Sequence, residues 1–162
     1  MQRVKTQGFT LIEILIVMVI ISIVSGIALL TITSNQHKQL QQVAKKLSHL
    51  IVLAEHQAML QPATLGLGVS KTGYQFFEFK EGNKWRALND RHFGSHLVSA
   101  SVQFILKIRG KQIPLDGKPG IIISESGDMT PFVLFIGKNG EKPLYQVKGE
   151  ANGKVTSGVV HE

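Results

Sequence analysis

Residues 5–24 read KTQGFTLIEILIVMVIISIV, and this stretch decides how the chain is organised. No residue between Glu13 and Lys38 carries a formal charge, and positions 14–32 are almost all aliphatic. In a helix, those positions rise by about 28 Å, close to the hydrocarbon thickness of a bilayer. The stretch is therefore predicted to span a membrane once.

Glu13 is the unexpected residue, because it places a carboxylate near the start of the apolar run. An ionised side chain at membrane depth costs about 2.5–3.5 kcal/mol on insertion scales and usually has a partner and a function. The alternative is a charge at the membrane interface, where the dipole of the helix N-terminus favours it by about 0.3–1 kcal/mol. Its position alone leaves both interpretations open.

A cleaved secretory signal is a rival interpretation of the same segment, because Arg3 and Lys5 form a basic start and Ala28 ends a small-x-small pattern. The apolar run exceeds the roughly 7–15 residues of a signal peptide and contains an acid, so retention is favoured over cleavage near Ala28. Because Arg3 and Lys5 precede the span, the positive-inside rule predicts a cytoplasmic N-terminus and a translocated chain after Ile32.

Length and composition limit the number of domains and the kinds of functional site that the chain can contain. The 162 residues leave room for one folded domain after the apolar segment. The chain has no cysteine, which excludes disulfides, thiolate nucleophiles and cysteine metal sites. The net charge is +7, and 16 basic and 10 acidic side chains follow from Asn35 onward. This surplus is compatible with nucleic acid, an acidic partner or simple solubility, and it chooses among them only weakly.

The helical pattern continues beyond the apolar segment. From Leu40 to Ala58 the apolar residues recur at i, i+3, i+4 and i+7, and Pro62 is a stop signal. One helix is therefore predicted from about Phe9 to Met59.

Beyond Pro62 the period of apolar residues changes to two, most clearly at residues 98–109. The other candidate strands are residues 64–70, 74–80, 84–88, 120–124, 131–137, 143–148 and 153–160. Turn signals between them, DGKPG at 116–120 among them, are spaced for hairpins. Together the patterns predict an α+β fold, in which the long helix packs on an antiparallel β-sheet domain.

GFTLIE at residues 8–13 stands behind a short basic leader and before a long apolar run, and it resembles the processing motif of type IV pilins and type II secretion pseudopilins. The resemblance implies a type IV pilin-like fold and a prepilin peptidase that cuts between Gly8 and Phe9 and N-methylates Phe9. It implies an assembly role for Glu13, whose carboxylate would neutralise the Phe9 amine of a neighbouring subunit in a low-dielectric layer. A pair within one chain is also open, because positions 9 and 13 share a helix face.

The same resemblance divides the chain into a leader at residues 1–8, a transmembrane helix at 9–34 and a periplasmic pseudopilin domain at 35–162, in which the helix continues to about residue 60. It implies a single-pass protein of the inner membrane, with a cytoplasmic N-terminus and a periplasmic C-terminal domain, that is extracted into the periplasmic pseudopilus. Small residues in the helix allow close contact between helices, namely Ser22, Ser25, Gly26 and Ala28.

Two further segments resemble the minor pseudopilin H branch of the family (GspH/FimT). They are GYQFFEFKEGNKWRALNDR at residues 73–91, which contains Trp85, and SESGDMTPFVLFIG at 124–137, which contains Thr130-Pro131-Phe132. The same residues suit turns and core, and that local role is favoured over direct partner contact.

The resemblance to this branch implies a structural subunit of the type II secretion system, at or near the tip of the pseudopilus that drives export of folded proteins across the outer membrane. Its implied partners are the major pseudopilin G, the minor pseudopilins I, J and K, prepilin peptidase and inner-membrane lipid.

The alternative is a FimT-like minor pilin of a type IV pilus that binds DNA for natural transformation. Lys107, Arg109 and Lys111 alternate along one predicted strand edge, which suits phosphate contacts. However, the tail GKVTSGVVHE lacks the arginine-rich element of the DNA-binding branch, and basic strand residues are usually a solvated face. Nucleic acid is therefore the less favoured partner.

The sequence predicts no catalytic residue, metal site, cofactor or small-molecule substrate. HExxH, P-loop and nucleophile-elbow patterns are absent. His92 and His96 have the spacing of a helical metal pair, but Gly94 between them disfavours a helix. His49 and His56 on the amphipathic helix are predicted to be surface or boundary residues.

Overall fold

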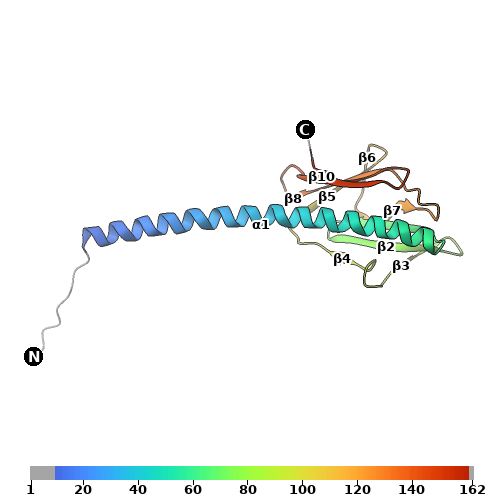
Figure 1. Cartoon of the computed structure of the whole chain (residues 1–162), viewed down its shortest axis with the longest axis horizontal. Coiled ribbons are helices and arrows are strands. Elements are labelled where there is room, and N and C mark those ends of the chain that lie inside the picture. The colour runs from blue at the N-terminus through green and yellow to red at the C-terminus, as the bar shows by residue number, and fades with distance from the viewer. Residues whose placement is uncertain (1–9, 161–162) are drawn as a thin grey trace, which may run out of the picture. The chain divides into compact units, whose positions relative to one another are not determined.

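The computed structural model describes residues 10–160, without the side chains of residues 27–34 and 36. In this part of the chain, the helix α1 (Leu11–Leu60) precedes ten β-strands (Figure 1). The long helix and the strand-rich domain predicted from the sequence are both present. The chain divides into two compact units, Met1–Lys38 and Gln39–Glu162, so that α1 contributes to both.

The strands form two antiparallel sheets. The first has the order β3-β2-β1-β7, with β4 paired to β2, and its strands are β1 (Leu65–Ser70), β2 (Gly73–Lys80), β3 (Lys84–Ala87), β4 (His96–Leu97) and β7 (Asp116–Ile123). The second has the order β10-β9-β8-β5-β6, formed by β5 (Val102–Ile108), β6 (Lys111–Ile113), β8 (Phe132–Lys138), β9 (Tyr145–Gly149) and β10 (Val155–Val159).

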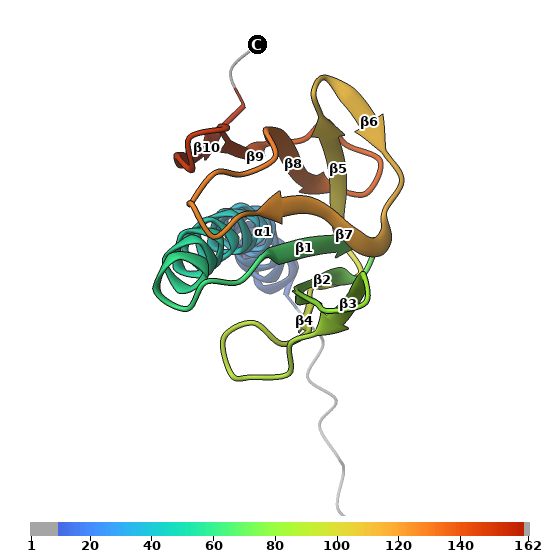
Figure 2. The ribbon, with the colours of Figure 1, turned by 90° about the vertical axis from the view of Figure 1, so that its right-hand side faces the viewer.

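The core of the unit 39–162 lies between the two sheets and the second half of α1, which Figure 2 shows beside both sheets. One face of the helix between Leu40 and Ala58 is buried, in agreement with the predicted periodicity. Leu47 and Ile51 are fully buried, and each such side chain contributes about 1.5–3 kcal/mol through removal from water. The apolar stripe therefore fixes this half of the helix to the strands.

The strand predicted at residues 98–109 is shorter than expected, and its first part is wrong. β5 begins only at Val102, because residues 99–101 form a turn in which the Val102 amide donates to the Ser99 carbonyl at 2.9 Å. The Ser99 and Ser101 hydroxyls lie 3.0 Å apart, and serine side chains of this kind compete with strand formation. The predicted inward alternation holds from Val102 through Phe104 to Leu106, all buried.

The turn predicted at DGKPG, residues 116–120, is also wrong, because this segment is the first half of β7. Gly117 has φ +76°, a conformation that glycine adopts without steric cost. The register between β1 and β7 shifts on both sides of Gly68, so the strand bulges here. The sequence signals were those of a turn, yet the chain continues through a bulge.

Gly68→Ala is expected to lower the free energy of unfolding of the domain by about 1–3 kcal/mol, because overpacking at a close backbone contact is destabilising. A Cβ atom on Gly68 would overlap the carbonyl oxygen of Gly117, and backbone cannot move aside as a side chain can. Gly158→Ala is the matched control, since its Cβ would meet nothing within 4 Å. Urea unfolding of a fragment of residues 35–162 measures both, and equal midpoints for the two variants would contradict the prediction.

Candidate processing and assembly site

The predicted assembly residue, Glu13, lies in the first turn of α1. The helix starts directly after Thr10, whose carbonyl oxygen accepts hydrogen bonds from the amides of Glu13 at 3.1 Å and Ile14 at 3.4 Å. Thr10 and Glu13 have the spacing of a capping box, a pattern that satisfies free amides at a helix start. The local sequence thus explains both where the helix begins and why a carboxylate is tolerated at its positive end.

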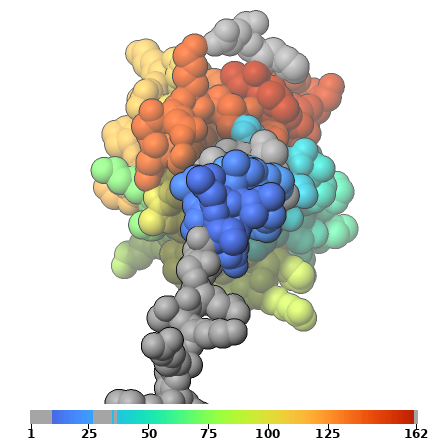
Figure 3. Space-filling view, turned by 90° about the vertical axis from the view of Figure 1, so that its left-hand side faces the viewer, coloured from blue at the N-terminus to red at the C-terminus, as the bar shows by residue number. Residues whose placement is uncertain are grey.

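The surroundings of Glu13 on the helix are apolar on every side. The large aliphatic side chains from Leu11 to Val24 are 45–85% exposed, with no side that is spared. Their surface is the blue region of Figure 3. Glu13 is the one ionisable residue among positions 10–26. A helix that is hydrophobic all round needs an apolar environment, so this segment is built to contact lipid or other apolar helices.

Other predicted parts of the site fall outside the described residues. These are Gly8 and Phe9, and the side chains of residues 27–34 in the predicted span. The pairing of Glu13 with a Phe9 amine therefore stays a prediction.

Within the described residues, no helix provides an apolar stretch long enough to cross a membrane.

The small residues of the helix leave parts of its surface open. The Ser22 hydroxyl donates to the Met18 carbonyl at 2.8 Å, so its polar atom is satisfied within the helix. Gly26 has nothing within 4 Å of its Cβ position. Ser25 is exposed, and the side chain of Ala28 lies outside the described residues. Such positions permit another helix to approach closely.

The two segments that carry the resemblance to the H branch have clear roles within the domain. A Cβ on Gly66 would lie 2.8 Å from the Trp85 ring, so the glycine makes room for the indole on the outer face of the first sheet. The Ile122 amide donates to the Thr130 hydroxyl at 3.1 Å, and Phe132 is only 2% exposed. These contacts support a role of Trp85, Thr130 and Phe132 in the fold.

The basic residues considered for DNA binding do not lie along one strand edge, and that prediction is wrong. β5 ends at Ile108, Arg109 lies in the turn with φ 49°, and Lys111 begins the returning strand β6. The Nζ atom of Lys107 lies 5.4 Å from the centre of the Phe135 ring, where it makes a cation–π contact. The hairpin therefore separates the cations that the period-two pattern had aligned.

The histidine pair has contacts of its own. The Nε2 atom of His96 lies 2.8 Å from the His92 carbonyl oxygen, and its ring lies 5.1 Å from that of Tyr74. Burial raises the pKa of Tyr74 to about 12, so its phenol stays protonated at neutral pH. Across the described residues, no group of three or more His, Asp or Glu side chains could hold a metal ion.

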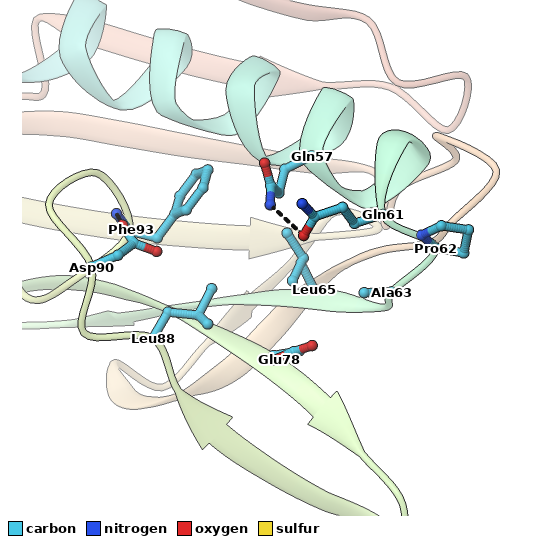
Figure 4. A pocket seen from close by; sticks show the side chains of 9 residues that line it. All are labelled: Gln57, Gln61, Pro62, Ala63, Leu65, Glu78, Leu88, Asp90 and Phe93. Carbon is cyan, nitrogen blue, oxygen red and sulfur yellow. Dashed lines mark hydrogen bonds between the residues drawn. The ribbon is translucent and has the colours of Figure 1, made fainter.

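A cavity of about 450 Å³ lies at the C-terminal end of α1, and sequence reasoning did not find it (Figure 4). Gln57 and Gln61 of the helix line one side and are joined by a hydrogen bond of 3.1 Å. Two carboxylate side chains also line the cavity, and both already have partners. Glu78 pairs with Lys80 at 2.6 Å, and Asp90 accepts hydrogen bonds from the amides of residues 92 and 93. No sequence pattern connects these distant positions, which only the fold brings together.

Comparison with known proteins supports the motif and the fold separately. Residues 3–29 match the prokaryotic N-terminal methylation motif. Over 149 residues the chain is 28% identical to type II secretion system protein H of Pseudomonas aeruginosa, a match that covers 83% of this chain and 85% of that protein. Protein H of Pectobacterium carotovorum is 25% identical over 154 residues, covering 82% and 81%. Protein H of Aeromonas hydrophila is 23% identical over 173 residues, covering 96% and 94%.

Solved structures share the fold. The minor pseudopilin EpsH from the type II secretion system of Vibrio cholerae matches with a TM-score of 0.68 and 19% identity, over 77% of this chain and 96% of that one. The solution structure of E. coli GspH matches with a TM-score of 0.60 and 15% identity, over 78% and 90%. The chain thus carries the methylation motif, is similar over most of its length to type II secretion system protein H of three organisms, and shares the α+β fold of the solved minor pseudopilins.

Proposed function

We propose that the chain is a minor pseudopilin of the type II secretion system, a structural subunit of the periplasmic pseudopilus that drives export of folded proteins across the outer membrane. The observation that carries the proposal is a methylation motif at residues 3–29 that extends into the first part of α1, where the helix is apolar on all sides, and α1 continues into a domain with the fold of EpsH. A packing subunit needs these parts and no catalytic group. The chain is proposed to act without enzymatic activity.

Processing creates the amine with which the Glu13 carboxylate is proposed to pair. Prepilin peptidase hydrolyses the Gly8–Phe9 peptide bond, releases residues 1–8 and leaves an amine on Phe9, which is then N-methylated. In an apolar layer an isolated amine and an isolated carboxylate are each costly, and pairing them offsets part of that cost. The Glu13 carboxylate of one subunit therefore holds the Phe9 amine of its neighbour, and this pairing fixes how far a new subunit advances along the filament.

The location follows from the same parts. Residues 9–34 anchor the chain in the inner membrane, the domain at 35–162 lies in the periplasm, and assembly extracts the subunit into the pseudopilus. A position at or near the tip, between the major pseudopilin G and the minor pseudopilins I, J and K, is part of the proposal. The exposed apolar surface of the helix supports incorporation into a filament, because filaments grow through heterologous contacts between such surfaces.

The experiment compares this function with DNA uptake. The fragment of residues 35–162 contains the compact unit 39–162, and its cooperative unfolding is checked first. It is then titrated with double-stranded DNA at several salt concentrations, while the full chain is tested for crosslinks to tagged pseudopilins. We expect crosslinks and no DNA binding at low salt. DNA affinity in the micromolar range or tighter that falls steeply with salt, without crosslinks, would replace the proposal with DNA uptake.

A further inference from the structure

The edge strands of the two sheets differ in how they are protected against pairing with another chain. β3 carries Lys84 and Arg86, both exposed. β7 contains Pro119 and a bulge, and β6 has only three residues before Pro114. Charges, prolines, bulges and short length are the usual devices that keep a sheet edge from recruiting a further strand. β4, which pairs only with β2, has just two residues. Four of the five edge strands in the described part of the chain thus have such a device.

The fifth edge strand, β10, has none of them. The strand Val155–Val159 reads VTSGV, without a charge or a proline. It pairs with β9 in continuous antiparallel register from Val155 opposite Gly149 to Val159 opposite Tyr145. Four of its five residues are exposed, and β10 lies at the margin of its sheet in Figure 2. Its length, regularity and composition are those of a strand that can accept a neighbour.

The hydrogen bonds of the hairpin show which groups of β10 face outward. The Glu150 amide donates to the Lys154 carbonyl, and the Val160 amide donates to the Leu144 carbonyl, each at 2.9 Å. In an antiparallel ladder, alternate residues direct both main-chain groups to the same neighbour. Even-numbered residues from 154 to 160 therefore face β9. The amides and carbonyls of the odd-numbered residues point away from β9, namely Val155, Ser157 and Val159.

The outward main-chain groups of β10 and the side chain of Lys154, which directly precedes the strand, lack partners within the described chain. No hydrogen bond to the amide or carbonyl of Val155, Ser157 or Val159 occurs among residues 10–160 outside the strand pairing with β9. Lys148 on the neighbouring strand is paired with Glu150 at 3.2 Å. Lys154, by contrast, is exposed and forms no ion pair with any described residue. As far as residues 10–160 show, the edge therefore offers three donors, three acceptors and one cation without an ion pair.

We propose that the outer edge of β10 binds an extended segment of another pilin-like subunit, which adds to the second sheet as a sixth strand and places an acidic residue beside Lys154. The inference rests on the proposed function, since it names the surface through which the subunit meets a partner. Strand addition of this kind draws its affinity from main-chain hydrogen bonds. Specificity comes from the charge at the edge.

A second copy of the chain fits this edge less well. When β10 pairs antiparallel with itself so that all three outward residues of both copies are used, Ser157 faces Ser157 and Val155 faces Val159. That register puts Lys154 directly opposite Val160, which offers no carboxylate to the cation. An acidic strand of a different subunit satisfies both the main chain and the charge. The observations therefore favour a different subunit.

The test uses one position with two substitutions. Ser157→Pro removes an outward amide but no bond of the hairpin, and an edge strand tolerates proline. Ser157→Ala keeps the amide and is the matched control. A benzophenone amino acid replaces Gly158, whose Cβ position meets nothing within 4 Å. The full chain is crosslinked by light in cells in which each other pseudopilin carries its own tag.

We expect a crosslink to one tagged pseudopilin that falls at least about fivefold with Ser157→Pro and is unchanged with Ser157→Ala, as expected for main-chain pairing. Lys154→Glu should weaken it, and a lysine in place of the facing acid of the partner should restore it. Hydrogen exchange of the full chain in detergent, with that purified pseudopilin added, should show protection at residues 154–160. Equal crosslinking of the proline and alanine variants, or no protection at this segment, would overturn the proposal. Crosslinks only between two tagged copies of this chain would also overturn it.

The failure of this inference can be distinguished from the failure of the proposed function. If the chain is cleaved after Gly8 and crosslinks to pseudopilins through its helix, while Ser157→Pro has no effect at β10, only the edge proposal fails. If the chain is neither cleaved nor crosslinked to any pseudopilin, the proposed function fails. Circular dichroism of the proline variant checks that a lost crosslink does not reflect an unfolded domain.

Discussion

Replacing Gly8 by valine is expected to leave the chain as a full-length precursor in the inner membrane. The peptidase must bring its catalytic groups against the carbonyl of residue 8, and glycine allows the closest approach to a backbone. A clash that costs about 3 kcal/mol in the transition state slows cleavage by roughly 100-fold. Intact mass spectrometry of membrane fractions should therefore find residues 1–162 in place of a chain that starts at methylated Phe9.

The control for this experiment is Gly26→Val, which adds the same side chain at a glycine of α1 that lies outside the GFTLIE segment at residues 8–13. The Cβ position of Gly26 meets nothing within 4 Å, so the substitution is expected to leave processing unchanged. Gly8→Ala adds a single methyl group and is expected to give an intermediate fraction of mature chain. A mature, N-methylated product from Gly8→Val would refute the cleavage site.

Glu13→Ala is expected to have the opposite pattern, with normal processing and failed assembly. Glu13 is not part of the cleaved bond, and in the proposed pairing it supplies the counter-charge for the amine that cleavage creates. Removing one partner of a buried ion pair costs about 3–5 kcal/mol, which corresponds to a loss of at least about 100-fold in the association constant. Crosslinking of the variant to other pseudopilins, normalised to the amount of mature chain, measures the loss.

Glu13→Gln distinguishes the pair from a helix cap. Glutamine fits the capping box as glutamate does, so a capping role predicts assembly close to that of the unchanged chain. A charge pair predicts a loss close to that of Glu13→Ala, because the amide has no charge to offer the amine. Normal crosslinking of the alanine variant would remove the pairing proposal altogether.

The parts of the fold that the sequence predicted are those that local patterns determine. The stripe from Leu40 to Ala58 and the alternation from Val102 to Leu106 each lie within one element, so their periods reveal the buried face. The errors concern places where a distant strand decides the conformation. β7 continues through Gly117 because β1 lies against it, and β6 exists because β5 turns back at Arg109. No local pattern contains that information.

In the candidate site too, the sequence predicted what a local motif contains and missed what depends on distant strands. Gly8, Phe9 and Glu13 lie within six positions of one another, so a single short motif contains all three. The predicted edge that joined Lys107 to Lys111 came from a period of two that was extended through a turn. The free edge of β10 follows only from the complete pairing of the other strands, since an edge is defined by what does not pair with it.

The burial of α1 along its length also determines how the domain responds to mechanical force. The helix lies lengthwise on the core from Leu40 to Ala58, a seam of about 27 Å. A pull along the helix axis strains every contact of this seam at once, as in shear, whereas a pull at right angles would break the contacts one after another. In the proposed pseudopilus, force that reaches the domain through α1 acts along the axis of this helix. The domain is therefore expected to withstand axial tension far better than lateral tension.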